Sequence, residues 1–119
     1  MTGAIDAEVE VLDRPQGHGY VSVEVTQENP FFPEGFRFWG HEFHYSRIIN
    51  PANLDFAFKI SRGHGIDGDR DGIIKKNMLA TYTHLHAAGV PQWAEVFVNL
   101  AIRMRDEHED SLIVKKGLI

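Results

Sequence analysis

The chain has 119 residues, a formal net charge of -5 and no cysteine. This length suits one domain with a single hydrophobic core, and an acidic balance without a run of Lys or Arg argues against a nucleic-acid or anionic-membrane surface. The absence of cysteine excludes disulfides, thiolate metal sites and a cysteine nucleophile carried by this chain. No apolar stretch approaches the roughly 18 residues of a membrane span, and the first residues lack the pattern of a signal peptide, so we expect a soluble, cytoplasmic protein.

The first third of the chain alternates apolar and polar residues with a period of two, which is typical of half-buried β-strands. Valines alternate with glutamates over residues 8–11, and with Ser22 and Glu24 over residues 21–25. Proline and glycine cluster in residues 14–19 and 27–35, and these clusters predict loops. The sequence therefore predicts two strands with a loop after each.

The longest extended run covers Phe36 to Ile49. Glu42 and His44 are two residues apart and share one face of this run, so the carboxylate could orient or polarise the imidazole. The alternative is an ordinary cross-strand polar pair beside aromatic residues that fill the core. Alternation divides the run into two sets: Phe36, Phe38, Glu42, His44 and Ser46 on one face, and Arg37, Trp39, His41, Phe43 and Tyr45 on the other.

The remaining elements complete a mostly antiparallel fold. Leu54–Ser61 and Ile73–Tyr82 read as strands joined by a turn, which suggests a meander. Pro91 suits a first helical turn, and apolar residues recurring at 94, 97, 98, 101 and 102 predict an amphipathic helix that ends near residue 108 and covers the sheet. We expect one domain over residues 1–119, in which the apolar residues 109–119 form a tail that docks or adds a strand.

Two segments resemble metal sites only in part. His41 and His44 look like a compressed zinc motif, but residues three apart on a strand point to opposite faces. The segment 67–72 matches the first half of a calcium loop, but the glutamate expected at position 12 falls on Met78. We therefore expect a strand and a polar hairpin loop instead of metal sites.

His84 and His86 lie on one face of an extended segment, at a spacing that is common in β-scaffold metal sites. Such a site would need a third ligand from elsewhere in the chain. Ordinary packed or surface histidines are the alternative. A further alternative is that one of the two is a general base, since it lies at the end of a strand and just before the helix.

Four motifs resemble, in this order, the C-terminal half of the glutamine amidotransferase domain of cobyrinic acid a,c-diamide synthases: RPQGHGYVSVEV, ENPFFP, GHEFHYS and TYTHLH. The resemblance covers nearly the whole chain, and GHEFHYS after RPQGHGY is its most specific part. Members of this family amidate cobyrinic or hydrogenobyrinic acid, nickel-sirohydrochlorin or siroheme. Residues 50–77 are slightly more similar to the siroheme-linked branch.

The resemblance implies an α/β fold: part of a class I glutamine amidotransferase (flavodoxin-like) domain, this portion being mostly antiparallel β with one C-terminal amphipathic helix. It also implies a two-part enzyme. An ATP- and Mg-dependent synthase domain activates the a and c carboxylates of a tetrapyrrole, and the amidotransferase domain hydrolyses glutamine and passes on its ammonia. In the family a cysteine on a strand-to-helix elbow attacks glutamine, and a histidine shuttles its proton.

Carried over by motif position, that general base is His84. The family usually places glutamate two residues later, where this chain has His86, so Glu42 is the candidate orienting carboxylate and His86 a further catalytic candidate. The GHEFHYS strand supplies the candidate substrate-binding residues, which are His41, His44, Tyr45 and Ser46.

The synthase domain and the elbow of the family have no counterpart here, and Met1 aligns with the interior of the family's domain. We therefore expect the chain alone not to hydrolyse glutamine, to depend on the remainder of the synthase, and to expose a sheet edge that favours a homodimer. Two alternatives remain. One is a small β-rich metal-binding module that uses His84 and His86 with His44 or His64, and the other is a non-catalytic interaction module.

Overall fold

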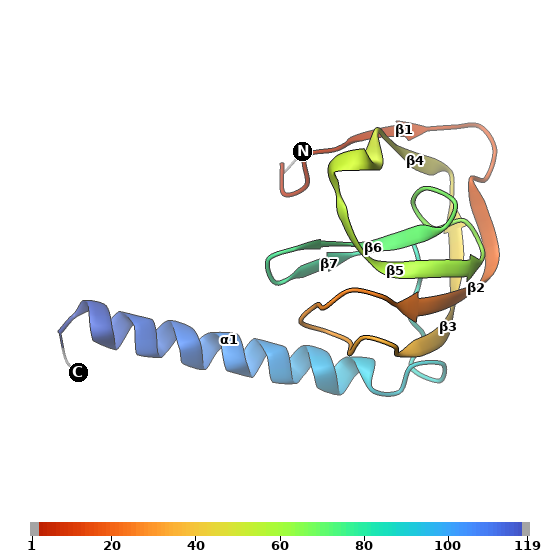
Figure 1. Cartoon of the computed structure of the whole chain (residues 1–119). Helices are drawn as coiled ribbons and strands as arrows, with labels where there is room; N and C mark the ends of the chain where they lie inside the picture. The colour runs from red at the N-terminus through yellow and green to blue at the C-terminus, as the bar shows by residue number, and fades with distance from the viewer. Residues whose placement is uncertain (1–2, 118–119) are drawn as a thin grey trace.

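A computed structural model describes residues 3–117 and shows antiparallel β-structure followed by one helix (Figure 1). The main sheet has the strand order β3-β2-β5-β6-β7, and all of its neighbouring strands are antiparallel. Its strands are β2 (Gly17–Val25), β3 (Arg37–His44), β5 (Asp55–Arg62), β6 (Arg70–Lys75) and β7 (Met78–Ala80). A second, two-stranded sheet pairs β1 (Glu8–Val11) with β4 (Ser46–Ile49). The expectation of a mostly antiparallel portion with one C-terminal helix is confirmed.

The hydrophobic core lies against one face of the main sheet. The three valines of β2 that the alternation places inward, Val21, Val23 and Val25, are all buried. They pack with Phe38 of β3 and Phe58 of β5, together with residues of the loop between β2 and β3. Burial of each such apolar side chain contributes about 1.5–3 kcal/mol, so this cluster fixes which face of β2 and β3 is inside.

Three predicted strands differ in detail from the structure. The valines of β1 are exposed, Val11 to 77%, because β1 pairs only with β4 in the small sheet. The run from Phe36 to Ile49 is divided at Tyr45, where β4 leaves the main sheet to join β1. The run 73–82 divides into β6 and β7 around a turn at Lys76, whose φ is 55°.

β5 agrees with the predicted strand to within one residue, and the segment before β6 forms the predicted loop. Gly17–Gly19 belongs to β2 instead of the preceding loop. A short 3-10 helix, Pro51–Asn53, links β4 to β5.

The C-terminal helix α1 (Trp93–Lys115) is longer than predicted and does not cover the sheet. Residues 109–115 continue the helix instead of forming a docked tail or a strand, since no glycine or proline interrupts them before Gly117, whose φ is 68°. Residues 118–119 lie outside the described residues. Leu100 is the buried residue of α1. The C-terminal half of the helix projects beyond the sheet (Figure 1). No helix in the described part of the chain is both long and apolar enough to cross a membrane.

Candidate active site

Glu42 is a carboxylate buried on the inner face of β3, with 1% of its surface exposed. The backbone N–H of His64 donates to its Oε1 at 2.7 Å, and the N–H of Gly65 donates to its Oε2 at 2.9 Å. His44 lies on the same face, as the alternation predicts, and its Nε2 lies 3.2 Å from Oε2 of Glu42. Glu42 therefore ties β3 to the loop between β5 and β6.

His44 and Tyr82 join β3 to the segment that leads to His84. The two rings are stacked, with centroids 3.9 Å apart and an interplanar angle of 5°. Nδ1 of His44 hydrogen bonds to the carbonyl of Ser46 at 2.9 Å, and the hydroxyls of Ser46 and Tyr82 hydrogen bond at 2.7 Å. The side chains of His44 and Ser46 therefore make their hydrogen bonds inside the fold.

Asp71 is a second buried carboxylate, fully inaccessible to solvent, at the start of β6. It accepts hydrogen bonds from the N–H groups of Gly72, Tyr82 and Thr83 at 2.8, 3.1 and 2.9 Å. The hydroxyls of Thr81 and Thr83 donate to it at 2.7 Å each. Five donors thus converge on one side chain, and four of them come from residues 81–83.

His84 follows this segment directly, and its backbone pairs with β3. Its N–H donates to the carbonyl of His41 at 2.7 Å, and the N–H of His41 donates back at 3.2 Å. The two imidazole rings are neighbours, with centroids 6.1 Å apart. The backbone of His84 is therefore fixed on both sides, while its side chain is exposed.

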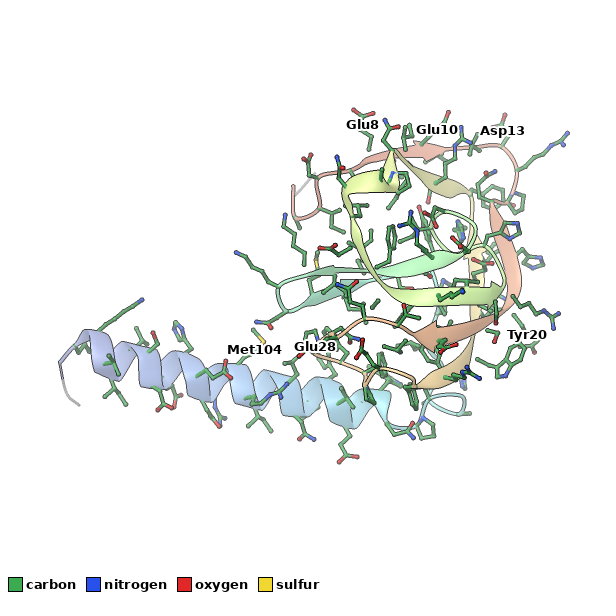
Figure 2. The ribbon with its side chains drawn as sticks, viewed as in Figure 1. Glu8, Glu10, Asp13, Tyr20, Glu28 and Met104 are labelled. Atoms are coloured by element: carbon green, nitrogen blue, oxygen red, sulfur yellow. The ribbon has the colours of Figure 1, made fainter. Side chains whose placement is uncertain are left out.

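The outer face of β2 and β3 carries an exposed surface of aromatic and histidine side chains, which we call the outer aromatic surface. Figure 2 shows Tyr20 projecting outward from β2. Tyr20, Trp39 and Phe43 are 68%, 55% and 49% exposed. The members of this surface are His18, Tyr20, Trp39, His41 and Phe43, with His84 at its edge. Exposed apolar patches of this kind mark interaction surfaces.

The candidate residues from the sequence fall into two separate groups. Glu42, His44 and Ser46 point inward, whereas His41 and His84 meet on the outer face, so the structure does not bring Glu42 to His84. Tyr45 is exposed and its ring contacts Phe43; His86 is exposed, and its Nδ1 accepts a hydrogen bond from the N–H of Ala88 at 3.1 Å.

The ligand set of the metal-binding alternative is not assembled. Among residues 3–117, no three His, Asp or Glu side chains are grouped so that they could hold a metal ion. The calcium-like segment is also used internally, because Asp67 pairs with Arg70 and Asp71 faces inward.

Sequence reasoning missed Asp71 as a member of the site. The polar segment DGDRDG is typical of a solvated loop. The burial of Asp71 within it depends on residues ten and more positions later in the chain. The available signals were the hydroxyls of Thr81 and Thr83, which flank Tyr82 and precede His84. Side chains of this kind bond to nearby carboxylates and to the backbone when the chain turns.

The placement of His84 beside His41 suits proton transfer. An imidazole on a fixed backbone, open to solvent beside a second imidazole, has the geometry of a general acid and base. None of the 119 residues is cysteine, so this chain supplies no thiol nucleophile.

Comparison of the sequence with known proteins identifies the family of this chain. Residues 1–91 match the CobB/CobQ-like glutamine amidotransferase domain. Cobyrinate a,c-diamide synthase of Methanothermobacter thermautotrophicus is 42% identical over 101 residues, which are 85% of this chain and 23% of that protein. The synthase of Magnetococcus marinus is 38% identical over 95 residues, which are 79% of this chain and 20% of that protein. The chain thus spans about a fifth of the length of these relatives.

A solved structure agrees with the fold. The crystal structure of a Thermoplasma acidophilum protein assigned as one component of a GMP synthase superposes with a TM-score of 0.63 at 21% identity. The match covers 87% of this chain and 53% of that one. At this identity the likeness shows the fold alone. The match of residues 1–91 to the family model shows that the chain belongs to the family of CobB/CobQ-like glutamine amidotransferase domains.

Proposed function

We propose that this chain supplies the general base, His84, of a glutamine-hydrolysing amidotransferase that amidates a tetrapyrrole. The observation that carries the proposal is the placement of His84, whose backbone is fixed against β3 while its imidazole is exposed. The resemblance of the TYTHLH motif assigns the general base to this position, and the chain belongs to that family. The curated relatives named cobyrinate a,c-diamide synthase support a tetrapyrrole acid as the final ammonia acceptor.

In this proposal the nucleophile is a cysteine thiol outside residues 1–119. His84 takes the thiol proton as sulfur attacks the carboxamide carbon of glutamine, and it then gives the proton to the departing ammonia. Water next hydrolyses the thioester to glutamate: His84 removes a proton from the attacking water and returns it to the departing cysteine sulfur. The ammonia is passed to a synthase domain, where ATP and Mg activate the a and c carboxylates of the acceptor.

The other candidate residues take supporting roles in the proposal. His41 and Tyr45, which are exposed, are candidates for contact with glutamine. His44 and Ser46 support the site by holding Tyr82, and Glu42 acts on His44 and the loop at His64 instead of orienting His84 directly.

His86 remains a second candidate base, since it is exposed and lies two residues after His84. The outer aromatic surface is the proposed contact with the remainder of the synthase, because it adjoins His84 and exposes large apolar side chains. Self-association into a homodimer through the same surface is the alternative use of it.

The test is glutaminase activity of this chain together with the nucleophile-bearing remainder of the synthase. We expect His84→Ala to lower kcat by about 10³-fold with little change in KM, since a general base acts in the transition state. His86→Ala is the matched control and should change kcat less than about threefold. Undiminished glutaminase in His84→Ala would refute the proposal, and a loss confined to His86→Ala would transfer the role to His86.

A further inference from the structure

We infer that Asp71 is a positioning residue for His84: it holds residues 81–83 in the one arrangement that presents the histidine on the outer face of β3. The inference concerns the placement of His84 and rests on the proposed function only for its effect on catalysis. The five hydrogen bonds of Asp71 come from residues other than His84. Asp71 acts on the three residues that precede His84, through four of its five hydrogen bonds.

The segment 81–83 depends on Asp71 because no strand ladder holds it. β7 ends at Ala80, and the next backbone pairing is the isolated bridge between His41 and His84. Between these points the N–H of Tyr82 donates to Asp71. The N–H of Thr83 donates both to Asp71 and to the hydroxyl oxygen of Thr81, and that hydroxyl itself donates to Asp71. An unpaired buried N–H is costly, so removing the acceptor would force this segment to rearrange.

A carboxylate is the side chain that fits these donors. Oδ1 accepts from the N–H groups of Gly72 and Tyr82, and Oδ2 accepts from Thr83 N–H and from the hydroxyls of Thr81 and Thr83. Both oxygens therefore face backbone N–H groups, which can only donate. An amide in place of the carboxylate would turn an NH₂ group toward at least one of them.

The opposite side of the segment is fixed by contact with β3 at Gly40. A Cβ at position 40 would lie 2.4 Å from Cγ2 of Thr83 and 2.9 Å from the carbonyl oxygen of His84, so only glycine permits this approach. Thr83 is 2% exposed and lies between Asp71 and Gly40. Because Thr83 is held from both sides, the position of the next Cα, that of His84, is fixed as well.

The structural test compares Asp71→Asn with Asp69→Asn, the same substitution at an exposed residue two positions away. In Asp71→Asn, amide hydrogen exchange at Tyr82 and Thr83 should become faster by at least about tenfold, while the amides of β2 and β5 keep their protection. The NMR signals of the His84 ring should shift or broaden. Equal loss of protection throughout the sheet, or no change at residues 82–84, would overturn the inference. If Asp71→Asn does not fold, Thr83→Val takes its place, because it removes one donor to Asp71 and keeps the side-chain shape. It should speed amide hydrogen exchange at Tyr82 and Thr83 by a smaller factor than the one expected for Asp71→Asn.

The catalytic test is a double-mutant cycle in the complete amidotransferase. Asp71→Asn should lower kcat by about 100-fold with KM within about threefold, because a displaced base loses its alignment with the thiol. In the His84→Ala background the same substitution should lower kcat no further, since Asp71 acts through His84. An equal loss in both backgrounds would contradict positioning. If His84→Ala itself left activity intact, the proposed function would fail, whereas hydrogen exchange would still decide whether Asp71 positions this segment.

Discussion

The two faces of β2 and β3 differ in how their polar and aromatic groups are used. On the inner face Glu42 is 1% exposed and fully bonded, and in the described part of the chain no buried side-chain N or O atom lacks a hydrogen-bond partner. On the outer face Tyr20, Trp39 and Phe43 are about half or more exposed, beside His41 and His84. The inner polar groups thus hydrogen bond to other parts of the fold and stabilise it. The outer groups remain available for a partner or substrate.

Removing the inner carboxylate should have the largest effect on stability. Glu42→Ala leaves the N–H groups of His64 and Gly65 without their acceptor and removes the partner of His44 Nε2, so we expect the free energy of unfolding to fall by about 3–5 kcal/mol. Urea denaturation measures the change. Glu24→Ala, which removes an exposed partner of Arg37, is the control and should cost less than about 1 kcal/mol. Similar losses in both variants would mean that the inner carboxylate is no more important than a surface one.

A methyl group at Gly40 should have the next largest effect, and it tests how the two faces are joined. Gly40→Ala forces Thr83 and His84 away from β3, and we expect a loss of about 1–3 kcal/mol from this overpacking. Thr83→Ser removes Cγ2 and keeps the hydroxyl that bonds to Asp71. The double variant should therefore regain part of the loss in thermal denaturation. If the losses of stability in Gly40→Ala and Thr83→Ser are additive, the contact between Gly40 and Thr83 does not determine how closely Thr83 and His84 approach β3.

Substitution on the outer face should change stability least. We expect Tyr20→Ser and Trp39→Ser each to alter the free energy of unfolding by no more than about 0.5 kcal/mol, because both side chains are mostly in solvent. Affinity for the nucleophile-bearing remainder, measured by titration calorimetry, should nevertheless fall at least about tenfold, as for aromatic contacts at an interface.

The control for these outer-face variants is Val11→Ser on β1, which should leave binding unchanged. Sedimentation should be measured on the same variants. Loss of self-association with unchanged binding of the remainder would assign the outer aromatic surface to a second copy of this chain.

Alternation over residues 21–25 and 36–44 predicted the core strands and the pairing of Glu42 with His44, because side-chain direction in a strand depends on local sequence alone. The same local rule failed for β1, whose exposure depends on where its partner β4 lies. It also could not show that α1 leaves the sheet, since apolar helical spacing does not specify what the helix packs against.

The site was predictable only in part for the same reason. The motif indicated His84, and alternation placed Glu42 inward, but their separation onto opposite faces depends on the bridge between His41 and His84. The burial of Asp71 arises from contacts across ten to twelve residues of chain. No periodic pattern encodes such contacts.

The makeup of the Asp71 cluster has a consequence for how the protein responds to ionic strength. Its five donors are backbone N–H groups and hydroxyls, and no Lys, Arg or His within residues 3–117 forms an ion pair with Asp71. Mobile ions screen exposed charge pairs such as Arg37–Glu24 and Arg47–Glu10, but they do not reach a fully buried carboxylate such as Asp71. The placement of His84 should therefore persist in concentrated salt that weakens the surface ion pairs.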